Sequence, residues 1–194
     1  MGKPIYTVTV PCDPDSMTVL ETLCETFLAT VPGVEEDKAL ALRLAVAEGC
    51  RNALVQQPGE GSLRLASLSF FRSHTSSGPG ALAIEIRDPG PGLAVDGKLP
   101  PYPHAMTGRD FSLRGGLGFE LLAKVESPWI ARLRIRELTH PGSCRREDML
   151  SELGRRGYGL MVLCRSWGEV LYHHREHSGT TLRLSAPNIP PGSV

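Results

Sequence analysis

The stretch Ile86-Arg87-Asp88-Pro89-Gly90-Pro91-Gly92-Leu93 decides how this chain is interpreted. It closes an apolar run at 81–87 that is typical of a β-strand, so Asp88 falls at a strand end. A carboxylate there can accept a hydrogen bond from the exocyclic amine of an adenine ring. Gly90 and Gly92 tolerate unusual dihedral angles and let a base approach the backbone, while the prolines stiffen the loop. Taken alone, the stretch also fits an ordinary Asp-Pro-Gly turn.

A second motif lies about forty residues upstream, on a helix predicted over 35–57. Glu48 and Asn52 are four residues apart, so they share one face of that helix. A neutral amide oxygen is a good ligand for Mg²⁺, and a nearby carboxylate can orient or deprotonate an attacking hydroxyl. Taken alone, the pair also fits the polar face of an amphipathic helix.

Two glycine motifs follow the loop. The sequence Gly157-Tyr158-Gly159-Leu160 opens a predicted helix that runs to about residue 167, and the free N–H groups at its start suit phosphates. Gly179-Thr180-Thr181 precedes a late strand and can close the floor of a pocket. A similar glycine cluster at 114–119 precedes a helix predicted over 117–125, so either cluster could face the phosphates. We favour the later one, because Gly179-Thr180-Thr181 follows it.

The bulk composition narrows the class of protein. The chain has 194 residues, and its 21 basic and 21 acidic side chains cancel, so no basic footprint argues for a nucleic-acid partner. Five cysteines without a CxxC pair indicate reduced thiols rather than a disulfide framework. No apolar run approaches about 18 residues and the start lacks a signal-peptide pattern, so we expect a soluble cytoplasmic protein without membrane contact.

The order of predicted elements gives the fold class. We expect a strand at 5–10, a helix after a turn in which Asp15 or Ser16 is the cap, the helix at 35–57, and an antiparallel pair at 63–71 and 81–87. A strand at 130–138, the helix after Gly157 and a closing hairpin at 170–172 and 180–184 complete the domain. This order predicts an α+β sandwich with helices on one face of a mixed sheet. It is not the regular βαβ alternation of a Rossmann fold. The chain also lacks the pattern GxxxxGK(S/T), which argues against a P-loop NTPase.

Together, these motifs resemble the Bergerat-fold (GHKL) ATPases, and among them most closely the anti-sigma-factor serine kinases and their histidine-kinase-like ATPase relatives. The resemblance covers about residues 5–92 and 154–186. It implies a single two-layer Bergerat domain over 1–186. The proline-rich composition of 187–194 predicts a frayed tail there. The gap between the two glycine motifs is longer than is usual in relatives, which implies an enlarged ATP-lid insertion at about 93–153.

The resemblance also implies cofactors and roles. The family binds ATP with Mg²⁺; Asn52 would be the metal ligand and Glu48 the general base. Asp88 would hold adenine on the loop of Gly90 and Gly92. The turn of Gly157 and Gly159 would anchor the phosphate lid, and Thr180 would lie near the base. Leu160 would complete the set of cofactor-binding residues.

Such kinases phosphorylate a serine on a small anti-anti-sigma partner, bind a sigma factor and often form homodimers. One departure supports an alternative. The Ala-Leu-Val-Gln-Gln sequence after Asn52 lacks the basic or His-Gly residues common there. A nucleotide-binding regulatory module without kinase activity therefore stays open. His173, His174 and His177 do not predict a metal site, because adjacent strand residues point to opposite faces and no acidic or Cys partner has the right spacing.

Overall fold

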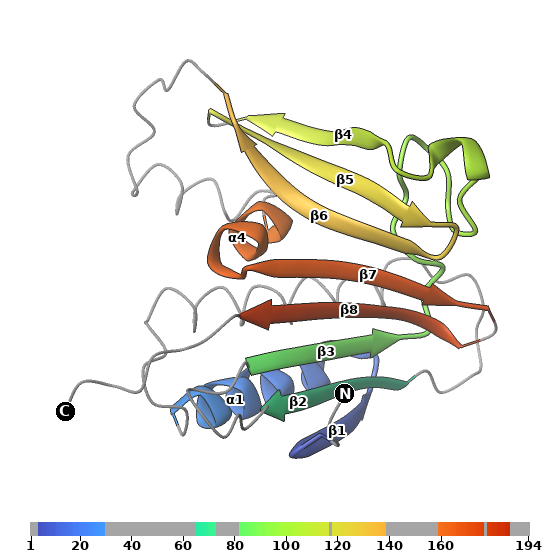
Figure 1. Ribbon diagram of the computed structural model, residues 1–194. Coiled ribbons are helices and arrows are strands. Elements are labelled where there is room, and N and C mark those ends of the chain that lie inside the picture. Colours follow the sequence, from blue (N-terminus) through green and yellow to red (C-terminus); the bar gives the residue numbers. More distant parts are fainter. Residues whose placement is uncertain are drawn as a thin grey trace, which may run out of the picture.

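The computed structural model describes residues 4–29, 65–72, 82–116, 118–138, 159–176 and 178–186 (Figure 1). Its elements, in chain order, are β1 (Tyr6–Pro11), α1 (Pro14–Ala29), β2 (Leu65–Arg72), β3 (Leu82–Asp88), the 3₁₀ turn η1 (His104–Met106), β4 (Asp110–Gly116), β5 (Phe119–Ser127), β6 (Ile130–Glu137), α4 (Gly159–Ser166), β7 (Glu169–Arg175) and β8 (Gly179–Ala186). The strands predicted at 5–10, 170–172 and 180–184 are confirmed, as is the antiparallel pair predicted at 63–71 and 81–87. The helix predicted over 35–57 and the tail at 187–194 lie outside the described residues.

The described strands form one sheet of eight in the order β1-β2-β3-β8-β7-β6-β5-β4. All seven pairings are antiparallel, so the expectation of a mixed sheet is wrong for these strands. The reason lies in the closing hairpin. β3 pairs with β8, the second strand of that hairpin, and this strand runs opposite to β3. Of the other pairs, β2–β3, β4–β5, β5–β6 and β7–β8 join strands that follow each other in the chain, which suits antiparallel pairing. β1–β2 and β6–β7 are antiparallel as well, although a helix lies between their strands.

Helix α1 begins with a side-chain cap two or three residues before the predicted one. The Ser16 N–H donates to Oδ1 of Asp13 at 2.7 Å, and Pro14 takes the first helical position, where a missing N–H costs nothing. Asp13 is therefore the cap, and the prediction of Asp15 or Ser16 is wrong. The same backbone hydrogen bond holds the pKa of Asp13 below its usual range.

One face of the sheet is apolar across most of its width. Residues opposite each other in antiparallel strands share a face, and the register places buried side chains opposite one another. One such row runs from β2 to β6 through Leu68, Ile86, Leu182, Tyr172 and Ala131.

Both described helices cover this apolar face. The Phe27 ring of α1 lies 4.2 Å from the Phe70 ring of β2, centroid to centroid. The guanidinium of Arg165 in α4 lies 5.1 Å from the centroid of the Phe119 ring in β5. Phe70 and Phe119 both project from the apolar side, since they alternate in step with its buried residues. The described part of the chain is thus α+β, as predicted; the complete two-layer sandwich stays a prediction.

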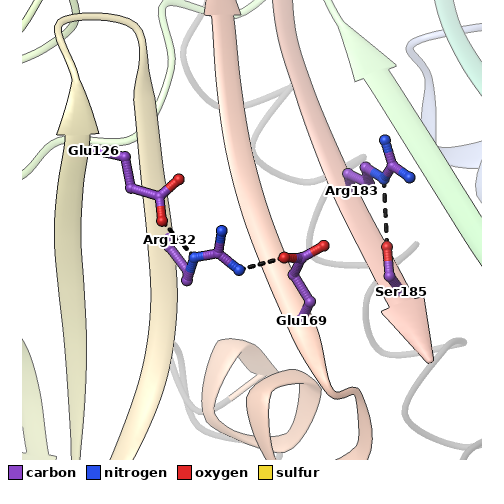
Figure 2. Close-up of polar contacts among 5 residues, drawn as sticks. All are labelled: Glu126, Arg132, Glu169, Arg183 and Ser185. Atoms are coloured by element: carbon purple, nitrogen blue, oxygen red, sulfur yellow. Dashed lines mark hydrogen bonds and ion pairs between the residues drawn. The ribbon is translucent and has the colours of Figure 1, made fainter. Parts of the chain in front are cut away.

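The opposite face of the sheet is polar. Figure 2 shows Arg132 of β6 between Glu126 of β5 and Glu169 of β7, and the Arg183 Nε donating to the Ser185 Oγ at 3.3 Å on β8. These side chains are partly exposed, so each ion pair contributes at most about 1 kcal/mol. The charges favour solvent on this side and thereby fix which face receives the helices.

Residues 93–138 continue the sheet rather than interrupt it. The helix predicted over 117–125 is wrong, because these residues belong mainly to β5, where Leu121, Ala123 and Val125 alternate onto the apolar face. The strand predicted at 130–138 is confirmed as β6. The assignment of 93–153 as an ATP lid stays a prediction, and residues 139–153 lie outside the described part.

The two glycine clusters differ in structure. In the first, Gly116 pairs with Phe119, so the cluster forms the connection between β4 and β5 and does not open a helix. In the second, Gly159 is the first residue of α4. Only the second therefore has the helical context that phosphate binding at a helix start requires. Within the described residues, no helix combines the length and apolar character needed to cross a bilayer.

Candidate nucleotide site

Three polar side chains form a row at one end of the sheet. Thr180 of β8 lies opposite Asp88 of β3 on one side and opposite His174 of β7 on the other. The row lies where β3 and β7 end and β8 begins, on the right in Figure 1. Because opposite residues share a face, the row continues the apolar face on which the helices lie. Polar groups on the buried side of a sheet need a purpose or a partner.

Asp88 is the most unusual member of the row. The residue is only 9% exposed, and its Oδ1 accepts the Gly90 N–H at 2.7 Å. Burial raises the pKa of Asp88 to about 6, against an ordinary value of 3.8, although the bond from Gly90 acts in the opposite direction. Among the described residues, no donor reaches Oδ2. A buried carboxylate with one oxygen free is suited to an uncharged donor, such as the exocyclic amine of adenine.

Thr180 fixes the loop that follows Asp88. Its hydroxyl, 2% exposed as a residue, donates to the Gly90 carbonyl at 3.0 Å. Gly90 thus has its N–H held by Asp88 and its C=O held by Thr180, although these residues come from different strands. The His174 Nδ1 lies 3.1 Å from the same Thr180 hydroxyl oxygen. The loop is therefore held in one conformation before any ligand arrives.

Glycine is required at two places by packing as well as by backbone angle. Gly92 has a φ of +101°, and a Cβ there would lie 2.6 Å from Cγ of Pro100. Gly179 has a φ of +80°, and a Cβ there would lie 2.1 Å from the Asp88 carbonyl oxygen. Both glycines let other chain segments come against the loop, which is a different reason from the close approach of a base expected from the sequence.

The structure brings together four of the predicted site residues: Asp88, Gly90, Gly92 and Thr180. Gly159 and Leu160 open α4, which packs on β6 and β7 near the start of β7, away from the end where Asp88 lies (Figure 1). Leu160 packs against the hydrophobic core. Glu48, Asn52 and Gly157 lie outside the described residues, so their roles stay predictions.

His174 is the residue of this row that sequence reasoning missed. The sequence had raised it only as a candidate metal ligand; over the described ranges, no group of three His, Cys, Asp or Glu side chains is placed to hold a metal. A signal was present: Val170, Tyr172 and His174 alternate, so the histidine had to share the face of two apolar residues. That Thr180 lies opposite His174, however, depends on the β7–β8 register, which cannot be predicted from the sequence.

The fold and the row of polar groups define an α+β domain with a buried carboxylate acceptor at the end of β3. The chain matches the model of the histidine kinase-like ATPase domain family over residues 10–186, and it belongs to that family. Membership places it in the Bergerat (GHKL) superfamily and implies ATP binding, usually with Mg²⁺. A search among curated proteins found no match.

The burial of Asp88 gives a prediction about stability and pH. Between pH 3.8 and about 6 the folded chain binds more protons than the unfolded chain, so Asp88 lowers the free energy of unfolding as the pH rises. A pKa rise of this size corresponds to about 3 kcal/mol at neutral pH. We expect Asp88→Asn, which cannot ionise, to gain stability relative to the native chain from pH 4 to pH 7. Urea unfolding of both proteins tests this, and a constant difference would contradict it.

Proposed function

We propose that this chain is an ATP-dependent serine/threonine protein kinase that acts as a switch, of the anti-sigma-factor type, and phosphorylates a small anti-anti-sigma partner. Membership in the ATPase family supports the nucleotide, and the motif order Glu48/Asn52, Asp88 loop, Gly157/Gly159 and Gly179-Thr180 supports this branch. One partner is a protein that presents a serine hydroxyl for phosphorylation. In a second state of the switch, this chain binds a sigma factor instead.

The observation that carries the proposal is the pre-built acceptor at Asp88. Both backbone polar groups of Gly90 are already bound, so the loop loses little freedom when a base arrives. Asp88 Oδ2 can accept the adenine amine, because among the described residues the hydrogen bond to this carboxylate goes to Oδ1. A guanine base presents a carbonyl at the corresponding place, so the same oxygen discriminates against GTP.

The catalytic half of the proposal rests on the predicted helix over 35–57. ATP would supply the γ-phosphoryl group, and Asn52 would hold Mg²⁺, which would neutralise charge on the phosphates. Glu48 accepts the proton of the partner's serine hydroxyl as that oxygen takes the phosphoryl group and ADP leaves. Glu48 and Asn52 share one helix face, which allows both to serve a single phosphate.

Calorimetric titration with ATP and Mg²⁺ tests the nucleotide site, and radiolabelled ATP with a panel of purified anti-anti-sigma-type domains tests the transfer. We expect the native chain to bind ATP and to label a serine of at least one domain. Glu48→Ala should retain ATP and slow the transfer by about a hundredfold, the contribution typical of a general base. Asn52→Ala should lose the magnesium-dependent part of the affinity.

The outcomes separate the possible functions. Transfer at an unchanged rate in Glu48→Ala contradicts the assignment of the base. ATP binding without labelling of any domain favours the alternative, a nucleotide-binding regulatory module without kinase activity, which the altered sequence after Asn52 also favours. No binding of ATP to the native chain overturns both.

A further inference from the structure

His174 has a hydrogen-bonding role that can be assigned from its partner. The Thr180 hydroxyl carries one proton, and that proton goes to the Gly90 carbonyl, which can only accept. The 3.1 Å contact between Thr180 Oγ1 and His174 Nδ1 therefore needs its proton from the imidazole. His174 must carry a proton on Nδ1, and the chain of donors runs from His174 through Thr180 to Gly90.

The imidazole is itself held from the other side. The His174 backbone N–H donates to the Trp129 carbonyl at 2.9 Å, and the two rings stack with centroids 6.0 Å apart and planes 21° apart. A Cβ on Gly92 would lie 3.5 Å from the His174 Nδ1, so the ring also borders the glycine loop. Burial lowers the pKa of His174, which favours the neutral ring.

We propose that His174 is a positioning residue of the nucleotide site, whose Nδ1–H fixes the Thr180 hydroxyl and, through it, the Gly90 carbonyl beside Asp88. This inference rests on the proposed ATP site. If His174 did not donate to it, the Thr180 hydroxyl would be free to rotate away from Gly90. The loop then loses one of its two restraints, and the free Asp88 oxygen loses its fixed direction toward a base.

Three substitutions of His174 test the assignment by geometry. The side-chain amide nitrogen of an asparagine lies about where the imidazole Nδ1 does, whereas the amide nitrogen of a glutamine reaches the place of Nε2. We expect His174→Ala and His174→Gln to weaken ATP binding by about five- to tenfold, the effect of one hydrogen bond. His174→Asn should bind within about twofold of the native chain. Adenosine should follow the same pattern, because the effect acts at the base end.

Nitrogen-15 NMR of the labelled native chain without nucleotide reads the tautomer directly, and exchange of the Gly90 amide proton reads the loop. We expect a protonated Nδ1 and faster Gly90 exchange in His174→Ala than in His174→Asn. A neutral Nε2–H tautomer overturns the inference, as does equal ATP affinity in all variants. Failure of the native chain to bind ATP overturns the proposed function instead, and the tautomer and Gly90 exchange then still decide whether His174 holds the loop.

Discussion

Replacing Gly179 by alanine is expected to lower the free energy of unfolding by about 4 kcal/mol. The backbone there has a φ of +80°, which costs a residue with a Cβ about 1–2 kcal/mol. The added methyl would also lie 2.1 Å from the Asp88 carbonyl oxygen and 2.7 Å from Cα of Pro89. Both neighbours are backbone atoms, so strands β3 and β8 must separate, at a further cost of about 1–3 kcal/mol.

Gly108 provides the matched control for this substitution. Its φ is +81°, and a Cβ there meets no heavy atom within 4 Å. Gly108→Ala should therefore lose only the backbone part, about 1–2 kcal/mol. Urea unfolding of the two variants isolates the steric part, and nucleotide titration should show impaired binding only for Gly179→Ala. Equal losses of stability would mean that β8 shifts to accommodate the methyl group.

Asp88→Asn is expected to reduce ATP affinity by about a thousandfold while the fold is kept. The asparagine carbonyl can still accept the Gly90 N–H, so the loop retains its restraint. Its amide group, however, turns a donor toward the adenine amine, and two donors that face each other in a buried site leave both unsatisfied. Calorimetric titration at neutral pH measures the loss.

Asp96 offers a control for the loss of one negative charge. This residue is exposed, lies in the same connection after β3, and has a φ of +49°, a conformation that asparagine tolerates. Asp96→Asn should bind ATP as the native chain does. If Asp88→Asn also keeps its affinity, the adenine amine does not use this carboxylate.

The strands that sequence reasoning predicted correctly carry their signal within their own residues. The run at 81–87 and the strand at 130–138 are rich in β-branched and aliphatic residues, and their flanking turns are marked by glycine and proline. Residues 117–125 are different, because Leu, Ala, Lys and Glu are good helix formers. Pairing of β5 with strands on both sides overrides that preference, and the sequence does not state such pairing.

The candidate site divides in the same way. The Asp88 loop and Gly179-Thr180 were predicted to belong to one pocket, and the structure places Asp88 opposite Thr180. The hydrogen bond from Thr180 to Gly90 joins residues 90 positions apart, so no local pattern indicates it. His174 joins the row of polar side chains through two strand registers. The β7–β8 register places it opposite Thr180, and the β3–β8 register places Thr180 opposite Asp88. The cap at Asp13 was missed for a local reason. Pro14 is already the first helical residue, so the helix begins earlier in the chain than the prediction assumed.

The three strands β4, β5 and β6 also change what lies at the border of the sheet. β7 has His174 near its end, and β6 covers one side of β7 through the pairs from Ile130 with His173 to Leu133 with Val170. Without that cover, the backbone N–H and C=O groups of β7 would be open beside the Asp88 loop, where any extended chain could add as a further strand. In the described sheet, the open borders are instead β1 and β4. The pairing of β6 with β7 thus keeps an added strand away from the backbone of β7.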